Sequence, residues 1–168
     1  DNAVKKSEII FLEGYLWDEG EPKKAFEKAI SCANKVAMSL SDKFCVDRHK
    51  SHFFDLVKNK LDIAFANEDE IMSLINAKDF KEVLTFAKEI KKLLIITRGE
   101  KGAISIKGDE IIEVGIKKNL NIVDLTGAGD LFAAGYLHGL INNFTGRECL
   151  DKGTEMSSKI IQQIGARI

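Results

Sequence analysis

Strand-like and helix-like segments alternate along the chain from Glu8 to Gly99. Short apolar runs typical of buried strands occupy Glu8–Leu16, Lys43–Asp47, Asp62–Asn67 and Leu93–Gly99. Between them, apolar residues recur at helical spacing in Lys23–Leu40, Ser51–Lys60, Glu68–Ala77 and Phe80–Lys92. The first of these segments begins just after Pro22, a residue that a first helical turn tolerates. This order requires crossover connections between parallel strands. We therefore predict an α/β fold with a mostly parallel sheet of about five strands and helices on both faces.

The pattern changes after Gly99. Apolar and polar residues alternate through Gly102–Ile116 around Gly108 and Asp109, which predicts a β-hairpin. A short strand is expected at Asn121–Asp124, followed by an apolar helix over Gly129–Ile141 and a last helix over Gly146–Ile164. Because no linker, repeat or low-complexity tract interrupts the sequence, residues 1–168 are predicted to be a single domain.

Composition excludes several classes of protein. The 25 basic and 26 acidic side chains nearly cancel, which argues against nucleic acid as a partner. No apolar run is long enough to suggest a membrane span. Three cysteines without close spacing fit neither a disulfide framework nor a zinc site, so we expect reduced thiols in a cytoplasmic protein.

The most informative segment for chemistry is the turn that precedes the apolar helix. Gly127 and Gly129 flank Ala128, so little side-chain bulk covers the N–H groups where the helix starts. Those N–H groups and the helix dipole suit an anion such as phosphate. Asp130 follows immediately, and from the residues alone it is either a general base for a hydroxyl or a helix cap.

This segment resembles the C-terminal signature of the ribokinase or PfkB family of sugar and nucleoside kinases, approximately D-T-x-G-A-G-D. Asp124, Thr126 and Gly127–Asp130 match it, while Leu125 replaces a threonine. The resemblance, softer outside the motifs, extends over nearly all of the chain and favours an adenosine-kinase-like branch. It implies a ribokinase-like three-layer α/β/α fold, Asp130 as catalytic base, and Gly127, Ala128 and Gly129 as an anion hole. A monovalent cation such as K⁺ near Asp124 and Thr126 is a further expectation.

Two other segments carry the resemblance. Asn67 and Glu70 are similar to the family's N-x-x-E motif, and this resemblance implies that they hold Mg²⁺ through water. From the residues alone, it is equally plausible that Asn67 and Glu70 form the capping box of a helix. Thr97, Gly99 and Gly102 are similar to the T-x-G-x-x-G nucleotide loop. These three residues and Thr126 are therefore expected to contact ATP.

Kinases of this family are usually longer than this chain. We expect residues 1–168 to be the nucleotide-binding and catalytic-base portion, without the N-terminal acceptor-binding half and its lid, and to be inactive alone. The implied acceptor is a small sugar or nucleoside, and the missing lid suggests a homodimer. Two alternatives stay open: a nucleotide- or phosphate-binding module without catalysis, and a dinucleotide-binding oxidoreductase, which the lack of a glycine fingerprint after the first strand disfavours.

Overall fold

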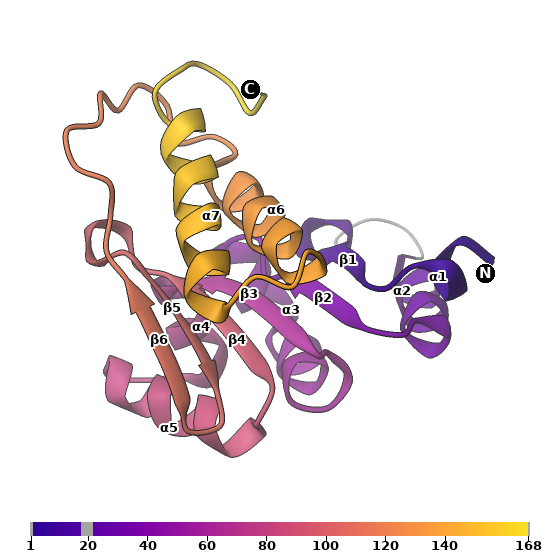
Figure 1. The fold of residues 1–168 in the computed structure, drawn as a ribbon. Coiled ribbons are helices and arrows are strands. Elements are labelled where there is room, and N and C mark those ends of the chain that lie inside the picture. The colour runs from indigo at the N-terminus through magenta and orange to yellow at the C-terminus, as the bar shows by residue number, and fades with distance from the viewer. Residues whose placement is uncertain (1, 18–21, 168) are drawn as a thin grey trace. The chain divides into compact units, whose positions relative to one another are not determined.

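A computed structural model describes residues 2–17 and 22–167 (Figure 1). The strands are β1 (Ile10–Glu13), β2 (Val36–Ser39), β3 (Ile63–Asn67), β4 (Leu93–Thr97), β5 (Ala103–Lys107) and β6 (Glu110–Val114). The α-helices are α1 (Asn2–Lys6), α2 (Pro22–Cys32), α3 (Lys43–Asp55), α4 (Glu68–Ile75), α5 (Phe80–Ile90), α6 (Ala128–Ile141) and α7 (Gly146–Ile160). Shorter turns are η1 (Gly14–Trp17), η2 (Leu56–Lys60) and η3 (Gly99–Lys101).

The strands form one six-stranded sheet in the order β1-β2-β3-β4-β5-β6. β1 and β2 pair in parallel, as do β2 and β3, with Glu13 opposite Ser39 and Ser39 opposite Phe65. The carboxyl ends of these three strands therefore meet at one edge of the sheet. β5 and β6 form the predicted hairpin, in which Gly108 adopts the left-handed conformation. The predicted α/β fold with a mostly parallel sheet is confirmed.

Contacts within the chain define two compact units. Unit 1 comprises Asp1–Ile96 with Ile106–Glu110, and unit 2 comprises Thr97–Ser105 with Ile111–Ile168.

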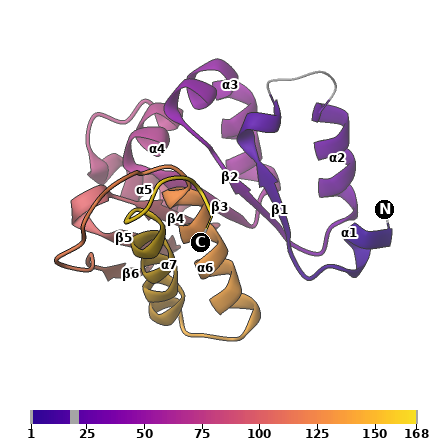
Figure 2. The same ribbon diagram turned by 90° about the horizontal axis from the view of Figure 1, so that it is seen from above.

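The core of unit 1 is formed by strands that are buried along most of their length. Val36, Ala37 and Met38 in β2, and Ile63–Ala66 in β3, are all buried, as expected for parallel strands covered on both faces. In Figure 2, α1 and α2 lie beside β1, and α3 lies next to α4. Asp42 caps α3, Asn67 caps α4 and Asp79 caps α5, each by accepting hydrogen bonds from first-turn N–H groups.

Two sequence predictions in unit 1 were wrong. The helix predicted over Lys23–Leu40 ends at Cys32, and Val36–Ser39 is strand β2, because Asn34 donates to the carbonyl oxygens of Lys5 and Ser7 and turns the chain. The strand predicted at Lys43–Asp47 is the start of α3. There the Asp42 carboxylate accepts a hydrogen bond from the Cys45 N–H at 2.6 Å and begins a helix.

Two further predictions were correct in kind but not in extent. The strand predicted at Glu8–Leu16 is limited to Ile10–Glu13, after which the chain enters η1. The last helix ends at Ile160 rather than Ile164. The strand predicted at Asn121–Asp124 is wrong, because the described residues form no strand there. The Val123 and Asp124 N–H groups instead donate to the carbonyl oxygen of Ile161, the C-cap residue of α7, at 2.8 and 3.3 Å.

In unit 2, α6 and α7 pack closely through glycines. A Cβ atom on Gly135 would lie 2.7 Å from the Lys152 carbonyl oxygen, and one on Gly153 would lie 2.9 Å from the Phe132 carbonyl oxygen. The backbones therefore approach more closely than any side chain would allow. Phe132, Tyr136 and Leu150 are buried in unit 2. The glycine turn at the start of α6 thus rests on a tightly packed helix pair.

No helix in the described residues is both long and apolar enough to cross a lipid bilayer.

Candidate active site

The glycine turn of unit 2 presents the start of α6 without a side-chain cap. Gly127 is the N-cap residue, has φ +78°, and makes no side-chain hydrogen bond to the helix. Its Cβ position would be 2.8 Å from the Ala166 Cβ, so a larger residue is excluded by space as well as by conformation. The Ala128 N–H donates to the Leu125 carbonyl oxygen at 3.1 Å, and the N–H groups that follow it in the first helical turn have no side-chain cap and are left available for an anion.

Asp130 lies three residues after the N-cap, in the first turn of α6. Its side chain is exposed and has no hydrogen-bond or ion-pair partner within residues 2–17 and 22–167. The interpretation of Asp130 as the helix cap is therefore wrong, because Gly127 occupies that position. A carboxylate without a partner beside an anion-binding turn is free to accept a proton from a hydroxyl.

Asp124 and Thr126 shape the approach to this turn. One Asp124 oxygen accepts hydrogen bonds from the Thr126 N–H at 2.9 Å and the Thr126 hydroxyl at 2.7 Å. The other accepts from the Gly165 N–H at 2.9 Å. The hydrogen bond from Gly165, followed by those from Thr126, lowers the pKa of Asp124 below its ordinary value.

The predicted nucleotide loop follows β4 and is a tight turn. The Arg98 N–H donates to the Gly102 carbonyl at 2.8 Å, and the Gly102 N–H donates to the Gly99 carbonyl at 3.0 Å. Both glycines have positive φ, +55° and +85°. A Cβ on Gly102 would lie 2.0 Å from the Val114 carbonyl oxygen, whereas one on Gly99 would meet nothing within 4 Å. Gly102 therefore shapes the turn, and Gly99 leaves an open surface on it.

A cavity of ≈ 490 Å³ lies in the same unit and was not predicted from the sequence. It is lined by Gly115–Lys117 and by residues of α7 that include Asp151 and Thr154. Gly115 is also the residue against which Gly102 packs, so the cavity adjoins the nucleotide loop. Its size is within the range of small-molecule sites.

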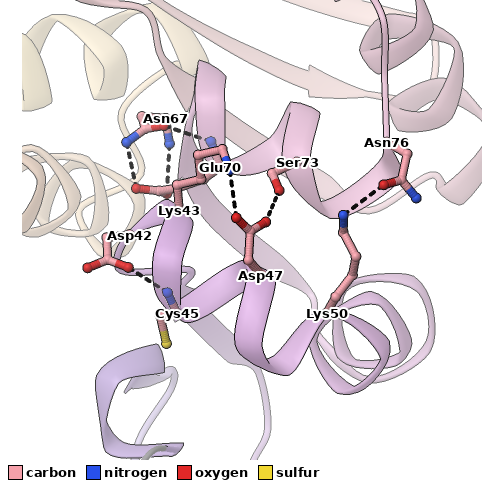
Figure 3. Close-up of polar contacts among 9 residues, drawn as sticks. All are labelled: Asp42, Lys43, Cys45, Asp47, Lys50, Asn67, Glu70, Ser73 and Asn76. Atoms are coloured by element: carbon pink, nitrogen blue, oxygen red, sulfur yellow. Dashed lines mark hydrogen bonds and ion pairs between the residues drawn. The ribbon is translucent and has the colours of Figure 1, made fainter.

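The Asn67–Glu70 pair in unit 1 forms a complete capping box (Figure 3). Asn67 accepts a hydrogen bond from the Glu70 N–H at 2.8 Å, and the Glu70 carboxylate accepts from the Asn67 N–H at 2.9 Å and its side-chain amide at 2.6 Å. The capping interpretation is therefore correct. A role in metal binding stays a prediction beside it.

Glu70 is a buried carboxylate near other acids. The residue is 4% exposed, and this burial is the main cause that raises the pKa of Glu70 to about 7. The hydrogen bond from the Asn67 N–H lowers the pKa in part, while the negative charges of Asp42 and Glu13 raise it further. Glu13 ends β1 and accepts a hydrogen bond from Ser41, while Asp42 follows β2 and accepts one from the Tyr15 hydroxyl at 2.7 Å. Neither acid was predicted from the sequence: Glu13 lies inside the predicted strand Glu8–Leu16, and Asp42 comes three residues after the end of β2, a strand that was predicted as helix.

These oxygen donors suit Mg²⁺ only through intervening water. Within the described part of the chain, no three His, Cys, Asp or Glu side chains come close enough to hold a metal ion directly. Both Glu70 oxygens already accept hydrogen bonds from Asn67. Carboxylates gathered near one another nevertheless provide the negative charge and oxygen donors that a hydrated Mg²⁺ prefers.

The model of the pfkB family of carbohydrate kinases matches residues 1–168. The chain belongs to this family. Its relatives include the cytidine kinase of Thermococcus kodakarensis, 34% identical over 112 residues that cover 65% of this chain and 40% of that protein. Fructoselysine 6-kinase of Escherichia coli is 27% identical over 175 residues, which cover 99% of this chain and 61% of that protein.

Solved structures of pfkB-like proteins share the fold. The adenosine kinase from Sinorhizobium meliloti superposes with a TM-score of 0.96 and 37% identity, covering 99% of this chain and 53% of that one. A probable sugar kinase from Rhizobium etli gives 0.95 and 38%, covering 99% and 52%. The chain therefore spans little more than half the length of these structures, and the ribokinase-like fold predicted for it is confirmed.

Proposed function

We propose that the protein is a kinase that transfers a phosphoryl group from ATP to a primary hydroxyl of a sugar or nucleoside. Family membership supports the class of reaction. The observation that carries the proposal for this chain is the exposed Asp130 carboxylate, which has no partner among the described residues and lies one step beyond a glycine turn without a side-chain cap. A proton acceptor and an anion-binding turn are the two groups that phosphoryl transfer to an alcohol requires of the protein.

In the proposed mechanism each group has one task. Asp130 accepts the proton of the attacking hydroxyl. Backbone N–H groups of Gly127, Ala128 and Gly129 stabilise negative charge on the transferred phosphoryl group. Thr97, Gly99, Gly102 and Thr126 are proposed to contact ATP, with the adjoining cavity in unit 2 as space for the rest of the nucleotide.

Mg²⁺ is the proposed metal cofactor. Asn67 and Glu70 would hold it through water, and the ion, when bound, neutralises phosphate charge. K⁺ near Asp124 and Thr126 stays a prediction.

A nucleoside is our preferred acceptor, and adenosine the first to test. The support comes from the solved structure of an adenosine kinase at 37% identity and from a cytidine kinase at 34% identity. We also propose a cytoplasmic location, which is supported by Cys32, Cys45 and Cys149, three cysteines that form no disulfide within the described residues. The homodimer through a lid stays a prediction.

The test is ADP release by the intact protein with adenosine, cytidine, ribose and fructose, each with ATP and Mg²⁺. Asp130→Asn keeps the size of the side chain but cannot accept a proton, so turnover is expected to fall roughly 10²–10⁴-fold. ATP affinity, measured by calorimetry, is expected to stay nearly unchanged. Asp109→Asn, in the hairpin turn, is the control for loss of an exposed carboxylate. Near-parental turnover of Asp130→Asn would refute the mechanism, and ATP binding without turnover of any acceptor would favour a binding module.

A further inference from the structure

We propose that a cavity in unit 1 binds a free α-amino acid with an apolar side chain. The cavity has a volume of ≈ 390 Å³ and is lined by residues of η1, α2, the end of α3 and η2. None of its lining residues is one of those assigned above to ATP, to Mg²⁺ or to proton transfer. The inference therefore goes beyond the proposed kinase function and does not rest on it.

The first observation is a buried hydrogen-bond donor in the wall of the cavity. Trp17, the last residue of η1, lines the cavity and is 7% exposed. Its indole N–H has no acceptor within residues 2–17 and 22–167. Phe26 and Phe53 pack edge-on against the Trp17 ring, with centroids 5.2 and 6.1 Å away, and hold its orientation. Because a buried N–H without a partner is destabilising, a ligand that supplies an acceptor oxygen gains this interaction.

The second observation is that unpaired charges of both signs line the same cavity. They are Lys23 and Glu27 of α2, Asp55 at the end of α3, and Lys60 of η2. None of these four side chains forms an ion pair with another side chain in the described part of the chain. The Lys23 ammonium group lies 5.6 Å from the centroid of the Trp17 ring, and Asp55 accepts a hydrogen bond from the Asn59 amide at 2.7 Å. Two cations and two anions thus remain available to a molecule in the cavity.

The third observation concerns the apolar part of the wall. Ile30 of α2 and Leu56 of η2 both line the cavity, and Leu56 is buried. η2 is a π-helical turn, in which the Leu61 N–H donates at 2.9 Å to the Leu56 carbonyl oxygen, five residues earlier. Such wide turns are rare and are frequently found at functional sites. This turn supplies one apolar and one cationic side chain, Leu56 and Lys60, to the wall.

These three features together select the class of ligand. A carboxylate accepts from the indole N–H of Trp17 and is attracted by the two lysines, while an ammonium group is attracted by the two acids. An apolar side chain is favoured against Ile30 and Leu56, where it leaves water. An α-amino acid carries all three groups on one small molecule, and the volume of the cavity is within the range of small-molecule sites. A phosphate or a nucleotide, in contrast, would be repelled by both acids.

Titration of the intact protein with L-leucine, L-methionine and L-phenylalanine tests the site. Binding is followed by NMR through the Trp17 indole N–H signal, which is identified by its absence from Trp17→Phe. We expect at least one of the three amino acids to shift this signal in a saturable manner, because a carboxylate oxygen becomes its acceptor. Failure of all three to shift it overturns the proposal.

Analogues of the amino acid that binds separate the contributions of its two charges. For leucine they are isocaproate, which lacks the ammonium group, and isoamylamine, which lacks the carboxylate. In calorimetry each analogue is expected to bind roughly tenfold more weakly than leucine, since each loses its hydrogen bonds to charged partners. Equal affinity of either analogue, or of inorganic phosphate, would show that the site does not recognise a zwitterion, and the proposal would fail.

Variants of the chain locate the bound amino acid at this cavity. Glu27→Gln should weaken leucine binding roughly tenfold and leave isocaproate binding unchanged or tighter, because only the ammonium group loses a partner. Glu89→Gln, in α5, is the matched control and should keep the parental affinity for both. Glu27 is exposed, so Glu27→Gln also decides the question by calorimetry if the buried Trp17→Phe substitution prevents folding. Parental leucine affinity in Glu27→Gln means that leucine binds elsewhere, and it refutes the proposal.

Discussion

Glu70 makes the stability of the fold depend on pH in a direction opposite to that of most carboxylates. Its pKa rises from an ordinary 4.5 to about 7 in the folded chain, chiefly because the side chain is buried. Between these values the folded state keeps the proton and the unfolded state releases it. The contribution of Glu70 is therefore fully present below pH 4.5, decreases as the pH rises toward 7, and is constant above it.

The magnitude follows from the same two values. Each pH unit in this window corresponds to about 1.36 kcal/mol, so the total loss is about 3 kcal/mol. Glu70→Gln carries no charge at any pH in this range and keeps an amide oxygen that can accept from the Asn67 N–H. The stability of the variant relative to the parent is therefore expected to improve by about 3 kcal/mol between pH 4.5 and pH 8.

Urea denaturation of the intact parent and variant across that pH range, without divalent metal, measures this difference. Glu89→Gln removes an exposed carboxylate of α5 and is the matched control. Other titrating groups are common to parent and variant and cancel in the comparison. A stability difference between parent and Glu70→Gln that stays constant with pH would refute the assignment of Glu70 as a protonated, buried acid.

Three further outcomes are expected. MgCl₂ should reduce the loss of stability at rising pH, because a cation near Glu70 favours the ionised form; an unchanged pH dependence would contradict the predicted metal site. Gly135→Ala should destabilise the intact protein by about 1–3 kcal/mol in urea denaturation, because its Cβ would lie 2.7 Å from the Lys152 carbonyl oxygen. Gly115→Ala is the control and should not destabilise the protein, because its Cβ would have no atom within 4 Å. Equal stability of the two variants would show that α6 and α7 separate easily. Gly99→Asn, which tolerates the left-handed conformation, should weaken ATP binding in calorimetry by filling the open surface of the loop; parental affinity would remove Gly99 from the site.

The elements with local signals were predictable from the sequence. The strand at Asp62–Asn67 is a continuous apolar run, and the structure buries Ile63 to Ala66 as parallel strands require. Asn67 and Glu70 form the capping box that their spacing allowed. The hairpin was indicated by alternation around Gly108. In each case the residues that decide the structure are neighbours in the sequence.

The errors arose where two signals competed. The helical spacing of apolar residues continues in the sequence through Val36 and Leu40. In the structure, however, the three consecutive residues Val36, Ala37 and Met38 are all buried, and three consecutive residues do not lie on one face of a helix. The apolar residues after Lys43 suggested a strand, whereas Asp42 is an N-cap that begins a helix. In both places the deciding signal is local: Asp42 is a residue that favours the N-cap position, and the apolar run from Val36 to Met38 is unbroken.

The candidate site was predictable only in its local part. Asp130 and the glycines before it are marked by their spacing, and the structure adds that Gly127, not Asp130, is the N-cap. Gly165 and Ala166 could not be found this way, because their contacts join segments some 40 residues apart. Likewise, only pairing of β1 with β2 brings Glu13 near the residues that follow β2.

The sequential order of the sheet has a consequence for folding kinetics. Every strand in β1-β2-β3-β4 pairs with its neighbour along the chain, so each new pairing closes a loop no longer than one crossover connection. Such loops carry a modest entropy cost, and proteins dominated by them fold faster than those with distant pairings. Unit 1 can therefore assemble by successive addition of adjacent strands. A substitution that weakens one crossover helix, such as α2 between β1 and β2, should slow the joining of those two strands and leave the rest of the sheet free to form.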